Sequence, residues 1–261
     1  MPSTSLRIGL AQFDIGWENP DANILHLQSL MQFEDYVDFL LLPEMWSTGF
    51  TMSPEIKAEH STGPALNWMV EQAQKLNLVI GGSIAVVENG QYFNRWYGVY
   101  PEGQVVKYDK RHLFSYGKEN LHYTPGNSRV VMEINGWKIM PVICYDLRFP
   151  VWCRNNNGYD LMVVVANWPT PRIHHWDSLL KARAIENQSY IAAVNRIGSD
   201  GNGLHYPGHS SIYDMNGIAL LEMKDKEGVG VFELDPSVLL QYREHFRFLQ
   251  DQDTFRISDM E

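Results

Sequence analysis

The spacing of apolar residues along the chain predicts strands and helices in turn. Apolar residues three or four positions apart, at Ile24, Leu27 and Met31, are typical of one face of a helix. Such patterns predict helices over Pro20–Phe33, Pro64–Leu76, Pro150–Asn156, Ile173–Asn187 and Pro236–His245. Apolar runs and alternating patterns predict strands over Leu6–Phe13, Val37–Leu42, Leu78–Val87, Gln91–Tyr100, Gln104–Tyr108, Val130–Ile134, Trp137–Ile143, Leu161–Ala166, Tyr190–Asn195, Ser210–Tyr213, Ile218–Met223 and Val229–Leu234.

The predicted strands are of two kinds, which together indicate the fold class. Some, such as Leu161–Ala166, are apolar throughout, whereas others alternate and meet at hairpin signals such as Asn89-Gly90 and Asn135-Gly136. Sheets covered by helices on one face and by another sheet on the other face account for this mixture. We therefore predict an α/β protein with a four-layer α-β-β-α sandwich. An open doubly wound sheet is the alternative, although it fits the hairpins less well. No linker or repeat interrupts residues 1–261, so we expect one domain.

Composition and charge narrow the classes of partner. The chain has 261 residues, 44% of them hydrophobic, and a formal net charge of -10. That charge argues against nucleic acid, whose binding requires clustered Lys and Arg. An anionic substrate would likewise need a local Arg or Lys. No apolar stretch approaches the roughly 20 residues that cross a bilayer, and the N-terminus shows no secretory pattern. We expect a cytoplasmic protein without a membrane partner.

Cys144 is the most informative residue. It follows the apolar run Ile139–Ile143 and precedes Asp146 and Arg148, so it lies where a rigid strand meets an open loop. A cysteine there is a candidate nucleophile, although most free cysteines are small core residues. Cys153, nine positions on, is interpreted as structural, and the two cysteines have no metal-ligand spacing.

Two other predicted strands end in charged residues that could act with Cys144. Glu44 follows Val37–Leu42, and Lys110 follows Gln104–Tyr108, so three strands each place one reactive group near an end. Taken singly, Glu44 and Lys110 could be solvated surface charges. A cysteine–histidine hydrolase is a further possibility, but no spacing singles out one histidine. The adjacent His174 and His175 face different directions on a helix, so we expect no metal site and no cofactor.

Four motifs in order resemble the nitrilase superfamily of carbon–nitrogen hydrolases. The resemblance runs from Ile8 to about Asp235. The motifs are Leu-Leu-Pro43-Glu44, Tyr108-Asp-Lys110-Arg-His-Leu-Phe114, Glu119 with Pro125-Gly126, and Ile143-Cys144-Tyr-Asp-Leu-Arg148-Phe-Pro150. The resemblance implies a Glu44–Lys110–Cys144 triad supported by Glu119.

Each residue that the resemblance implies has a plausible chemical role. Lys110 would favour the Cys144 thiolate by lowering its pKa, and Glu44 would act as general base and then general acid. Lys110 and the backbone N–H of Tyr145 would hold the oxyanion. Glu119 would orient Lys110 and balance its charge. The product would be a thioester acyl-enzyme that water releases.

Further segments are similar to those of bacterial omega-amidases. They are Trp46-Ser-Thr-Gly49-Phe50, Asn167-Trp168-Pro169, Ala182-Arg-Ala-Ile-Glu-Asn187, Ala193-Val-Asn195-Arg196 and Gly203-Leu-His205-Tyr-Pro-Gly208-His-Ser210. This resemblance implies hydrolysis of the terminal amide of 2-oxoglutaramate and 2-oxosuccinamate. Nitrile hydrolases of the superfamily usually carry longer C-terminal sequence, which favours an amidase here. Short aliphatic amidases and N-carbamoyl amino acid amidohydrolases remain open.

Such substrates carry a carboxylate away from the amide. Arg148 and Arg172 are candidates to bind it, because arginine pairs with carboxylate through two hydrogen bonds. The alternative for Arg148 is a structural ion pair with Asp146 or Glu186, and for Arg172 a surface charge. We expect a small pocket walled by Phe50, Trp168 and Trp176.

The resemblance also implies a homo-oligomer built from a dimer. Its candidate interface is the helix around His175–Asn187 and the C-terminal tail, about 240–261, whose aromatic residues would be poorly placed on a free end. A non-catalytic binding relative is the competing class, but such a protein would be expected to lose one of Glu44, Lys110 and Cys144, and all three are present.

Overall fold

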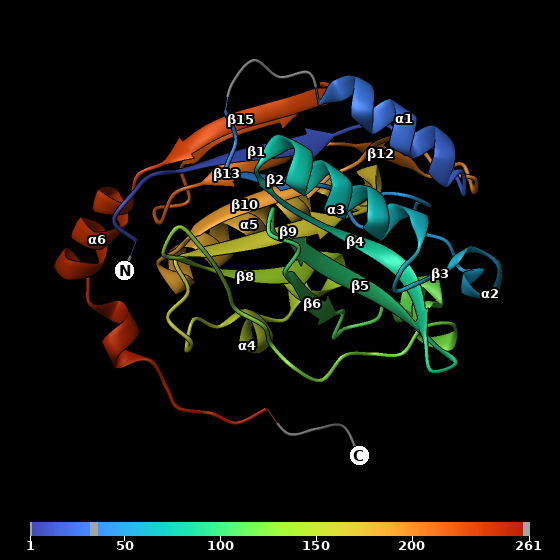
Figure 1. Cartoon of the computed structure of the whole chain (residues 1–261). Coiled ribbons are helices and arrows are strands. Elements are labelled where there is room, and N and C mark those ends of the chain that lie inside the picture. Colours follow the sequence, from blue (N-terminus) through green and yellow to red (C-terminus); the bar gives the residue numbers. More distant parts are fainter. Residues whose placement is uncertain (1, 32–35, 258–261) are drawn as a thin grey trace.

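The predicted strands form two large sheets in this computed structural model, which describes residues 2–31 and 36–257 (Figure 1). The first sheet has the order β15-β1-β2-β4-β5-β6, with β3 beside β4. Its strands are β1 (Leu6–Gln12), β2 (Phe39–Leu41), β3 (Glu59–His60), β4 (Val79–Glu88), β5 (Gln91–Val99), β6 (Val105–Asp109) and β15 (Gly228–Leu234).

The second large sheet has the order β14-β13-β10-β9-β8-β7, and β11 and β12 form a separate small hairpin. Its strands are β7 (Met132–Ile134), β8 (Trp137–Ile143), β9 (Leu161–Ala166), β10 (Tyr190–Asn195), β13 (Ser210–Tyr213) and β14 (Ala219–Lys224). The hairpin consists of β11 (Ile197–Ser199) and β12 (His205–Pro207). Within residues 2–31 and 36–257, no helix is long and apolar enough to span a bilayer.

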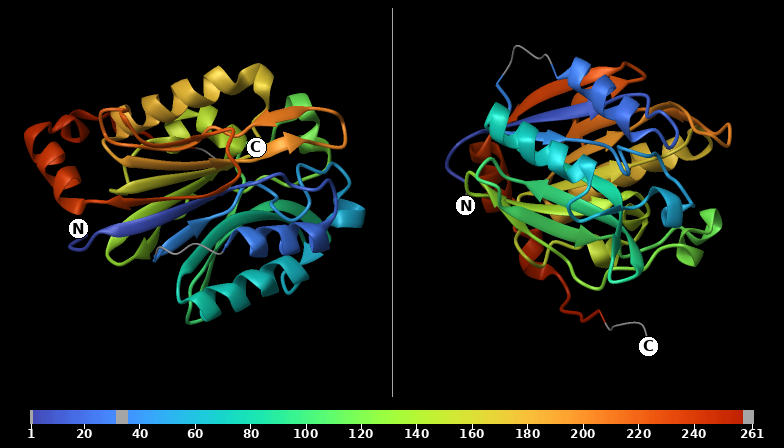
Figure 2. Two further views of the ribbon diagram at one scale, coloured as in Figure 1. Left: turned by 90° about the horizontal axis from the view of Figure 1, so that it is seen from above. Right: turned by 45° about the vertical axis from the view of Figure 1, so that its right-hand side comes forward.

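Helices cover the outer faces of the two sheets (Figure 2). The α-helices are α1 (Pro20–Leu30), α2 (Pro54–Lys57), α3 (Pro64–Leu76), α4 (Pro150–Cys153), α5 (Ile173–Asn187) and α6 (Pro236–His245). Short 3-10 turns are η1 (Ser115–Gly117), η2 (Glu119–Leu121), η3 (Cys144–Arg148), η4 (Thr170–Arg172) and η5 (Phe248–Asp251). The four-layer α-β-β-α sandwich is confirmed, and the open doubly wound sheet is wrong.

Two apolar clusters hold the layers together. In the first, Leu10 of β1 and Val142 of β8 belong to one cluster between the sheets, which Trp176 of α5 joins from the outside. In the second, Leu27 of α1 and Met69 of α3 pack on the outer face of the first sheet. Burying one such large apolar side chain contributes roughly 1.5–3 kcal/mol. The layers therefore form because each sheet has two apolar faces to cover.

The hairpins form where the turn residues permit them. Asn89 and Gly90 have φ values of 52° and 75°, and Asn135 and Gly136 have φ values of 49° and 81°. Two consecutive positive φ angles match the twist of the flanking strands, and Asn-Gly adopts them readily. The β4–β5 and β7–β8 hairpins therefore close as predicted.

The directions of the strands bring Glu44, Lys110 and Cys144 to the same end of the two sheets. Strand β2 runs parallel to β4, and two antiparallel steps, through β5, give β6 the direction of β4. In the other sheet, β8 and β9 are parallel. Glu44, Lys110 and Cys144 all follow strands of this set, so each lies just past a carboxyl end.

Most predicted boundaries hold to within a residue or two, and the differences are local. Helix α1 ends at Leu30, whereas the predicted helix continued to Phe33, of which residues 32–33 lie outside those described. Helix α4 ends at Cys153 rather than Asn156. Sequence patterns missed α2, β3 and the β11–β12 hairpin, because each is only two to four residues long.

Candidate active site

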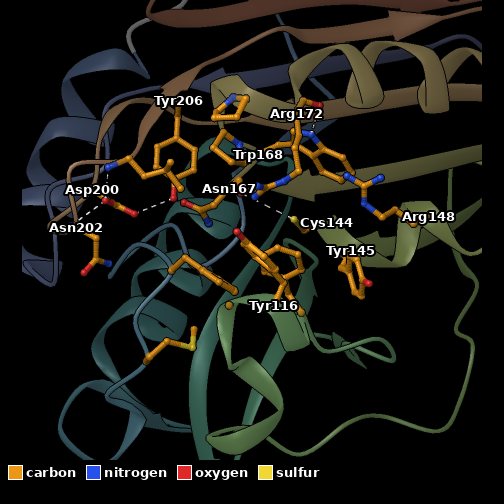
Figure 3. A pocket seen from close by; sticks show the side chains of 17 residues that line it. Tyr116, Cys144, Tyr145, Arg148, Asn167, Trp168, Arg172, Asp200, Asn202 and Tyr206 are labelled. Carbon is orange, nitrogen blue, oxygen red and sulfur yellow. Dashed lines mark hydrogen bonds between the residues drawn. The ribbon is translucent and has the colours of Figure 1, made fainter.

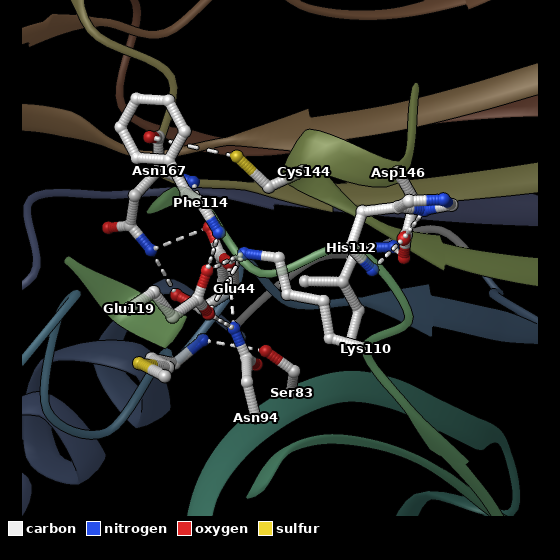
Figure 4. A network of polar contacts seen from close by, with 12 residues as sticks. Glu44, Ser83, Asn94, Lys110, His112, Phe114, Glu119, Cys144, Asp146 and Asn167 are labelled. Atoms are coloured by element: carbon white, nitrogen blue, oxygen red, sulfur yellow. Dashed lines mark hydrogen bonds and ion pairs between the residues drawn. The ribbon is translucent and has the colours of Figure 1, made fainter. Parts of the chain in front are cut away.

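Lys110 lies between two buried carboxylates. Its Nζ donates to Glu44 Oε1 at 2.7 Å and to the two carboxylate oxygens of Glu119 at 3.0 and 2.9 Å. All three side chains are fully excluded from solvent. Figure 4 shows the ammonium directed at both carboxylates. The cluster of Glu44, Lys110 and Glu119 contains two carboxylates and one ammonium. Charge-assisted hydrogen bonds, which are strong in a medium of low dielectric constant, fix its geometry.

Backbone and amide groups hold the carboxylates in turn. Asn94 Nδ2 donates to Glu44 Oε1 at 2.8 Å and to Glu119 Oε1 at 3.1 Å. The other Glu44 oxygen accepts from the Asn167 backbone N–H at 2.9 Å, and the other Glu119 oxygen accepts from the Phe114 N–H at 2.6 Å. Each of the four carboxylate oxygens therefore accepts at least one hydrogen bond from a backbone N–H or from Asn94. These bonds hold both side chains in place against Lys110.

Sequence reasoning missed the role of these two asparagines. Asn94 is a buried amide within the apolar end of β5, and Asn167 directly follows the fully buried strand β9. The signal for Asn167 is its place after an apolar strand, where Glu44 and Cys144 also lie. The signal for Asn94 is the polar side chain itself, because a buried amide requires partners.

Cys144 is the first residue of η3, and its side chain reaches the cavity described below. Its φ of 44° and the φ of 45° at Met45, next to Glu44, are left-handed values that residues with a Cβ rarely adopt. Such positions cost about 1–3 kcal/mol each and recur at functional sites. The turn presents the thiol beyond the end of the buried strand β8.

Burial has a larger effect than Lys110 on the charge of the thiol. Burial, together with the Glu44 carboxylate, raises the pKa of Cys144 well above its ordinary value, although Lys110 acts in the opposite direction. Lys110 thus lowers the pKa of the thiol as expected, but burial and the carboxylates outweigh it, so the net shift is upward. The thiol is protonated at neutral pH, and a base must remove its proton before it can attack.

The pKa values of Lys110 and Glu119 are also shifted, by burial and by the charges of neighbouring groups. Burial alone would lower the pKa of Lys110, but Glu119 and Glu44 outweigh it and raise that pKa, so the ammonium stays charged. Burial also raises the pKa of Glu119, against the opposing effect of Lys110. The cluster therefore keeps a fixed positive charge at Nζ.

A cavity of about 430 Å³ opens onto Cys144. Figure 3 shows Arg148, Trp168 and Arg172 near the thiol, with Asp200, Asn202 and Tyr206 on the opposite side. The cavity is lined by Phe50, Met52, Phe114, Tyr116, Gly117, Cys144, Tyr145, Arg148, Asn167, Trp168, Pro169, Pro171, Arg172, Asp200, Asn202, Leu204 and Tyr206. Four of the predicted pocket residues thus line it, Phe50, Arg148, Trp168 and Arg172, and so does Tyr145.

Trp176 is the exception, so its prediction as a pocket wall is wrong. It is buried beneath Trp168, with ring centroids 5.4 Å apart, and its Nε1 donates to the His209 backbone carbonyl at 3.0 Å. Sequence reasoning missed the opposite wall, where Asp200 Oδ2 accepts from the Tyr206 hydroxyl at 2.9 Å. That wall comes from the short β11–β12 hairpin.

Arg148 makes no ion pair with Asp146 or Glu186, which rules out the structural alternative. Asp146 accepts from His112, and Glu186 pairs with Arg183 instead. The Arg148 guanidinium lies 4.7 Å from the ring centroid of Trp168, and its Nη2 is 3.2 Å from His175 Nδ1. Burial and the Arg148 charge lower the pKa of His175, so a neutral ring can accept this hydrogen bond.

Arg172 faces aromatic rings rather than carboxylates. Its guanidinium lies 5.3 Å from the centroid of Phe114 and 5.9 Å from that of Tyr116. Among residues 2–31 and 36–257, no carboxylate forms an ion pair with Arg172 or Arg148. Two guanidinium groups thus face the cavity with their capacity for a carboxylate unused.

The remaining candidates lie outside the cavity. Cys153 is buried, and its Sγ donates to the Asp146 carbonyl at 3.4 Å, so it supports the η3 turn. Within the described part of the chain, no group of three or more His, Cys, Asp and Glu could hold a metal ion. The Cys144 thiol lines the cavity, and the Lys110 ammonium and the Glu44 carboxylate behind it lie close enough to shift its pKa. Such a set of groups can carry out acyl transfer by nucleophilic attack.

Comparison with known proteins points to the same chemistry. The family model for carbon–nitrogen hydrolases matches residues 7–244. The chain is 44% identical over 253 residues to an omega-amidase, YafV, of Escherichia coli K12, covering 97% of this chain and 98% of the relative. It is 36% identical to a 2-oxoglutaramate amidase of Bacillus subtilis, covering 94% and 96% of the two chains.

Solved structures share the fold over nearly the whole length. A CN-hydrolase superfamily protein of Xanthomonas campestris, solved with an arsenic adduct in its active site, superposes with a TM-score of 0.95 at 39% identity, covering 98% of this chain and all of the other. A branch 10 member of the nitrilase superfamily from Saccharomyces cerevisiae has a TM-score of 0.84 at 23% identity, covering 94% and 95%, which speaks for the fold alone.

Proposed function

Because the chain belongs to the carbon–nitrogen hydrolase family, we propose that it is an omega-amidase. Its substrates are small 2-oxo-dicarboxylic acid monoamides, namely 2-oxoglutaramate and 2-oxosuccinamate, which it hydrolyses to the keto acid and ammonia. One observation carries this proposal: the cavity is lined by a thiol, beside the Glu44–Lys110–Glu119 cluster, and by two guanidinium groups that pair with no carboxylate among the residues that the structure describes. The 36–44% identity to enzymes named for this activity supports it.

The first half of the reaction forms a thioester. Glu44 takes the Sγ proton of Cys144 as the sulfur attacks the amide carbonyl carbon. The carbonyl oxygen becomes an oxyanion, held by the Lys110 ammonium and the Tyr145 backbone N–H. Glu44 then gives the proton to the leaving nitrogen, the carbon–nitrogen bond breaks and ammonia departs. Losing one oxyanion donor typically costs about 3–4 kcal/mol of activation free energy.

The second half hydrolyses the thioester. Water replaces ammonia, Glu44 takes one of its protons, and the hydroxyl attacks the thioester carbonyl at the same oxyanion position. The carbon–sulfur bond breaks, and Cys144 recovers its proton from Glu44. Glu119 keeps its place throughout, because its two hydrogen bonds to Nζ hold Lys110 where the oxyanion forms.

The arginines set the substrate class. Arg148 and Arg172 bind the carboxylate at the end of the substrate away from the amide, while Trp168 and Phe50 contact its short chain. A local pair of cations is required because the whole protein carries a net charge of -10, which repels a free anion.

Ammonia release from four substrates tests this proposal. The wild type and Cys144→Ala are compared on 2-oxoglutaramate, glutaramate, a simple nitrile and an N-carbamoyl amino acid. We expect release from 2-oxoglutaramate in the wild type alone. Turnover of the nitrile or the carbamoyl compound, without turnover of the keto-amide, would replace the substrate assignment. No turnover of any of the four would favour a non-catalytic binding relative.

We further propose that the chain is one carbon–nitrogen hydrolase domain that assembles as a homodimer or a multiple of it. The start of the tail docks on the body, because Arg243 donates to Asp160 at 2.8 Å and Gln188 donates to the Phe246 carbonyl at 2.8 Å. Beyond that point Phe248 is 58% exposed and lies along a groove shared with Val151, which is 53% exposed. A second subunit would cover this apolar surface.

The compartment we propose is the cytoplasm. Both cysteines are free thiols in the structure, and the proposed mechanism needs one of them reduced. A reducing compartment keeps such a thiol available. Cell fractionation with detection of the protein would test this, and recovery from an oxidising compartment would contradict it.

A further inference from the structure

One buried carboxylate outside the proposed triad joins the two loops that carry Lys110 and Cys144. Asp146 lies two residues after Cys144, within η3, and none of its surface is exposed. Its Oδ2 accepts from the Tyr108 hydroxyl at 2.7 Å and from the Ile143 N–H at 3.1 Å. Its Oδ1 accepts from the His112 N–H at 2.9 Å and lies 2.8 Å from His112 Nδ1.

The partners of Asp146 flank Lys110 symmetrically. Tyr108 is two residues before Lys110 and His112 is two residues after it, so the short segment that carries the ammonium is held on both sides by one carboxylate. Figure 4 shows Asp146 and His112 together, on the side of Lys110 away from Glu119. The Tyr108–Asp146 contact crosses from β6 of one sheet to the η3 turn that follows β8 of the other.

The same carboxylate closes the turn at Cys144. The bond from the Ile143 N–H to Asp146 Oδ2 spans Cys144, whose φ of 44° is unfavourable without such support. The outer partners are themselves fixed. Trp152 Nε1 donates to the Tyr108 hydroxyl at 3.0 Å, and the His112 ring stacks on Phe149 with centroids 3.7 Å apart.

Helix α5 holds the turn from its other side. Arg183, which is buried, donates through Nε and Nη2 to the Leu147 carbonyl at 3.1 and 2.8 Å. The η3 turn is therefore fixed to α5 and to the Lys110 segment together. The Asp146 carboxylate makes the link to the Lys110 segment through both of its oxygens.

We infer that Asp146 is a positioning residue that sets the place of the Cys144 thiol relative to the Lys110 ammonium. It does not line the cavity, so it would not contact a substrate bound there. Its effect on the rate passes through the geometry of the two groups, and a misplacement of about 1 Å can cost about 100-fold in rate. The inference rests on the proposed function for its kinetic test, but not for its chemical test.

The test compares Asp146→Asn with a matched buried aspartate. An amide at position 146 keeps the shape of the side chain but presents N–H groups to donors, so one of its bonds must break. Asp160 is 3% exposed and also bonds a backbone N–H, that of Lys138 at 3.1 Å, at the opposite end of β8. It also pairs with Arg243 at 2.8 Å. Asp160→Asn is therefore the control for lost stability alone.

We expect Asp146→Asn to lower kcat about 100-fold on 2-oxoglutaramate with little change in KM, and Asp160→Asn to leave kcat within about twofold of the wild type. The rate at which iodoacetamide alkylates Cys144 should also change in the first variant and not in the second. Equal kcat values in the two variants, or unaltered alkylation of Cys144 in Asp146→Asn, would overturn the inference.

A milder variant keeps the test decisive if Asp146→Asn does not fold. Tyr108→Phe removes one of the four bonds to Asp146, so kcat should fall by a smaller factor, roughly 5- to 10-fold, at unchanged KM. An unchanged kcat in this variant would count against the inference. If the wild type hydrolyses no keto-amide, the proposed function fails, but the alkylation comparison still decides the role of Asp146.

Discussion

At the scale of single residues, the Cys144 thiol has a raised pKa, so the proposed reaction starts from an uncharged thiol. Burial and the Glu44 and Glu119 carboxylates together raise the pKa of the thiol more than the Lys110 ammonium lowers it. The reaction therefore needs Glu44 as a base at the moment of attack. This distinguishes the site from cysteine enzymes in which a stable thiolate is preformed.

The pH dependence of Cys144 alkylation tests this state directly. Because the pKa of the thiol is raised, we expect the rate with iodoacetamide to rise with pH to a midpoint above about 8.5, the ordinary value for cysteine. Glu119→Gln should move the midpoint to lower pH, since the Glu119 carboxylate raises that pKa. A wild-type midpoint at or below pH 7 would mean that Lys110 dominates and would contradict this account.

The arginines at the cavity can be tested by changing the charge of the substrate. Arg148→Gln should raise KM for 2-oxoglutaramate at least 10-fold, because a desolvated charge-assisted bond contributes about 1.5–3 kcal/mol. Hydrolysis of the uncharged amide butyramide should not change. Arg129→Gln, which alters an arginine outside the cavity, is the control. An equal loss on both substrates would indicate damage to the fold rather than a lost carboxylate contact.

The sequence located the charged residues of the site better than its neutral ones. Glu44, Lys110 and Glu119 meet in the structure as their motifs implied, while their catalytic roles stay predictions. Asn94 and Asn167 were missed because a single amide gives no periodic signal. Trp176 was misplaced because the pattern of a helix does not tell which tryptophan faces the cavity and which lies beneath it.

At the scale of elements, the sequence predicted the long elements and missed the short ones. Strands such as β8 and β9 and helices such as α3 and α5 have the predicted boundaries, since a continuous apolar run or several helical turns define each. The β11–β12 hairpin has three-residue strands separated by a glycine-containing loop, so no period can be read from it. One wall of the cavity was therefore not predictable from local pattern.

Close packing of the first sheet against neighbouring side chains gives a prediction at this scale. A Cβ at Gly98 would lie 2.7 Å from Trp96 and 3.0 Å from Met132 Sδ. Gly98→Ala should destabilise the protein by about 1–3 kcal/mol, because overpacking forces side chains off their rotamers. Denaturant unfolding measures this free energy. An unchanged or higher unfolding midpoint would show that Trp96 moves aside freely.

At the scale of the whole molecule, the net charge bears on substrate binding, and the exposed apolar surface bears on assembly. The negative surface as a whole does not attract the proposed anionic substrate, so the cavity depends on its own arginines. The apolar surface that stays exposed near the C-terminal tail, with Phe246 and Phe248, is the part we assign to a second subunit. The substrate site and the proposed interface are formed by different residues.

Replacing one exposed aromatic residue tests the assembly. Phe248→Asp should weaken association, because a charge would be buried without a partner in the proposed interface. Light scattering coupled to size-exclusion chromatography should then give a smaller mass than for the wild type. Leu25→Asp on α1, where Leu25 is 67% exposed, should leave the mass unchanged. A monomeric wild type would contradict the proposed dimer.

The most direct test of the central claim is the covalent intermediate itself. The wild type is mixed with 2-oxoglutaramate, quenched in acid within one turnover, and analysed by mass spectrometry of the intact protein and its peptides. We predict one 2-oxoglutaryl group on the peptide that contains Cys144, together with one ammonia released for each acyl group bound. Ammonia release that persists in Cys144→Ala, or an acyl group on another residue, would contradict the account.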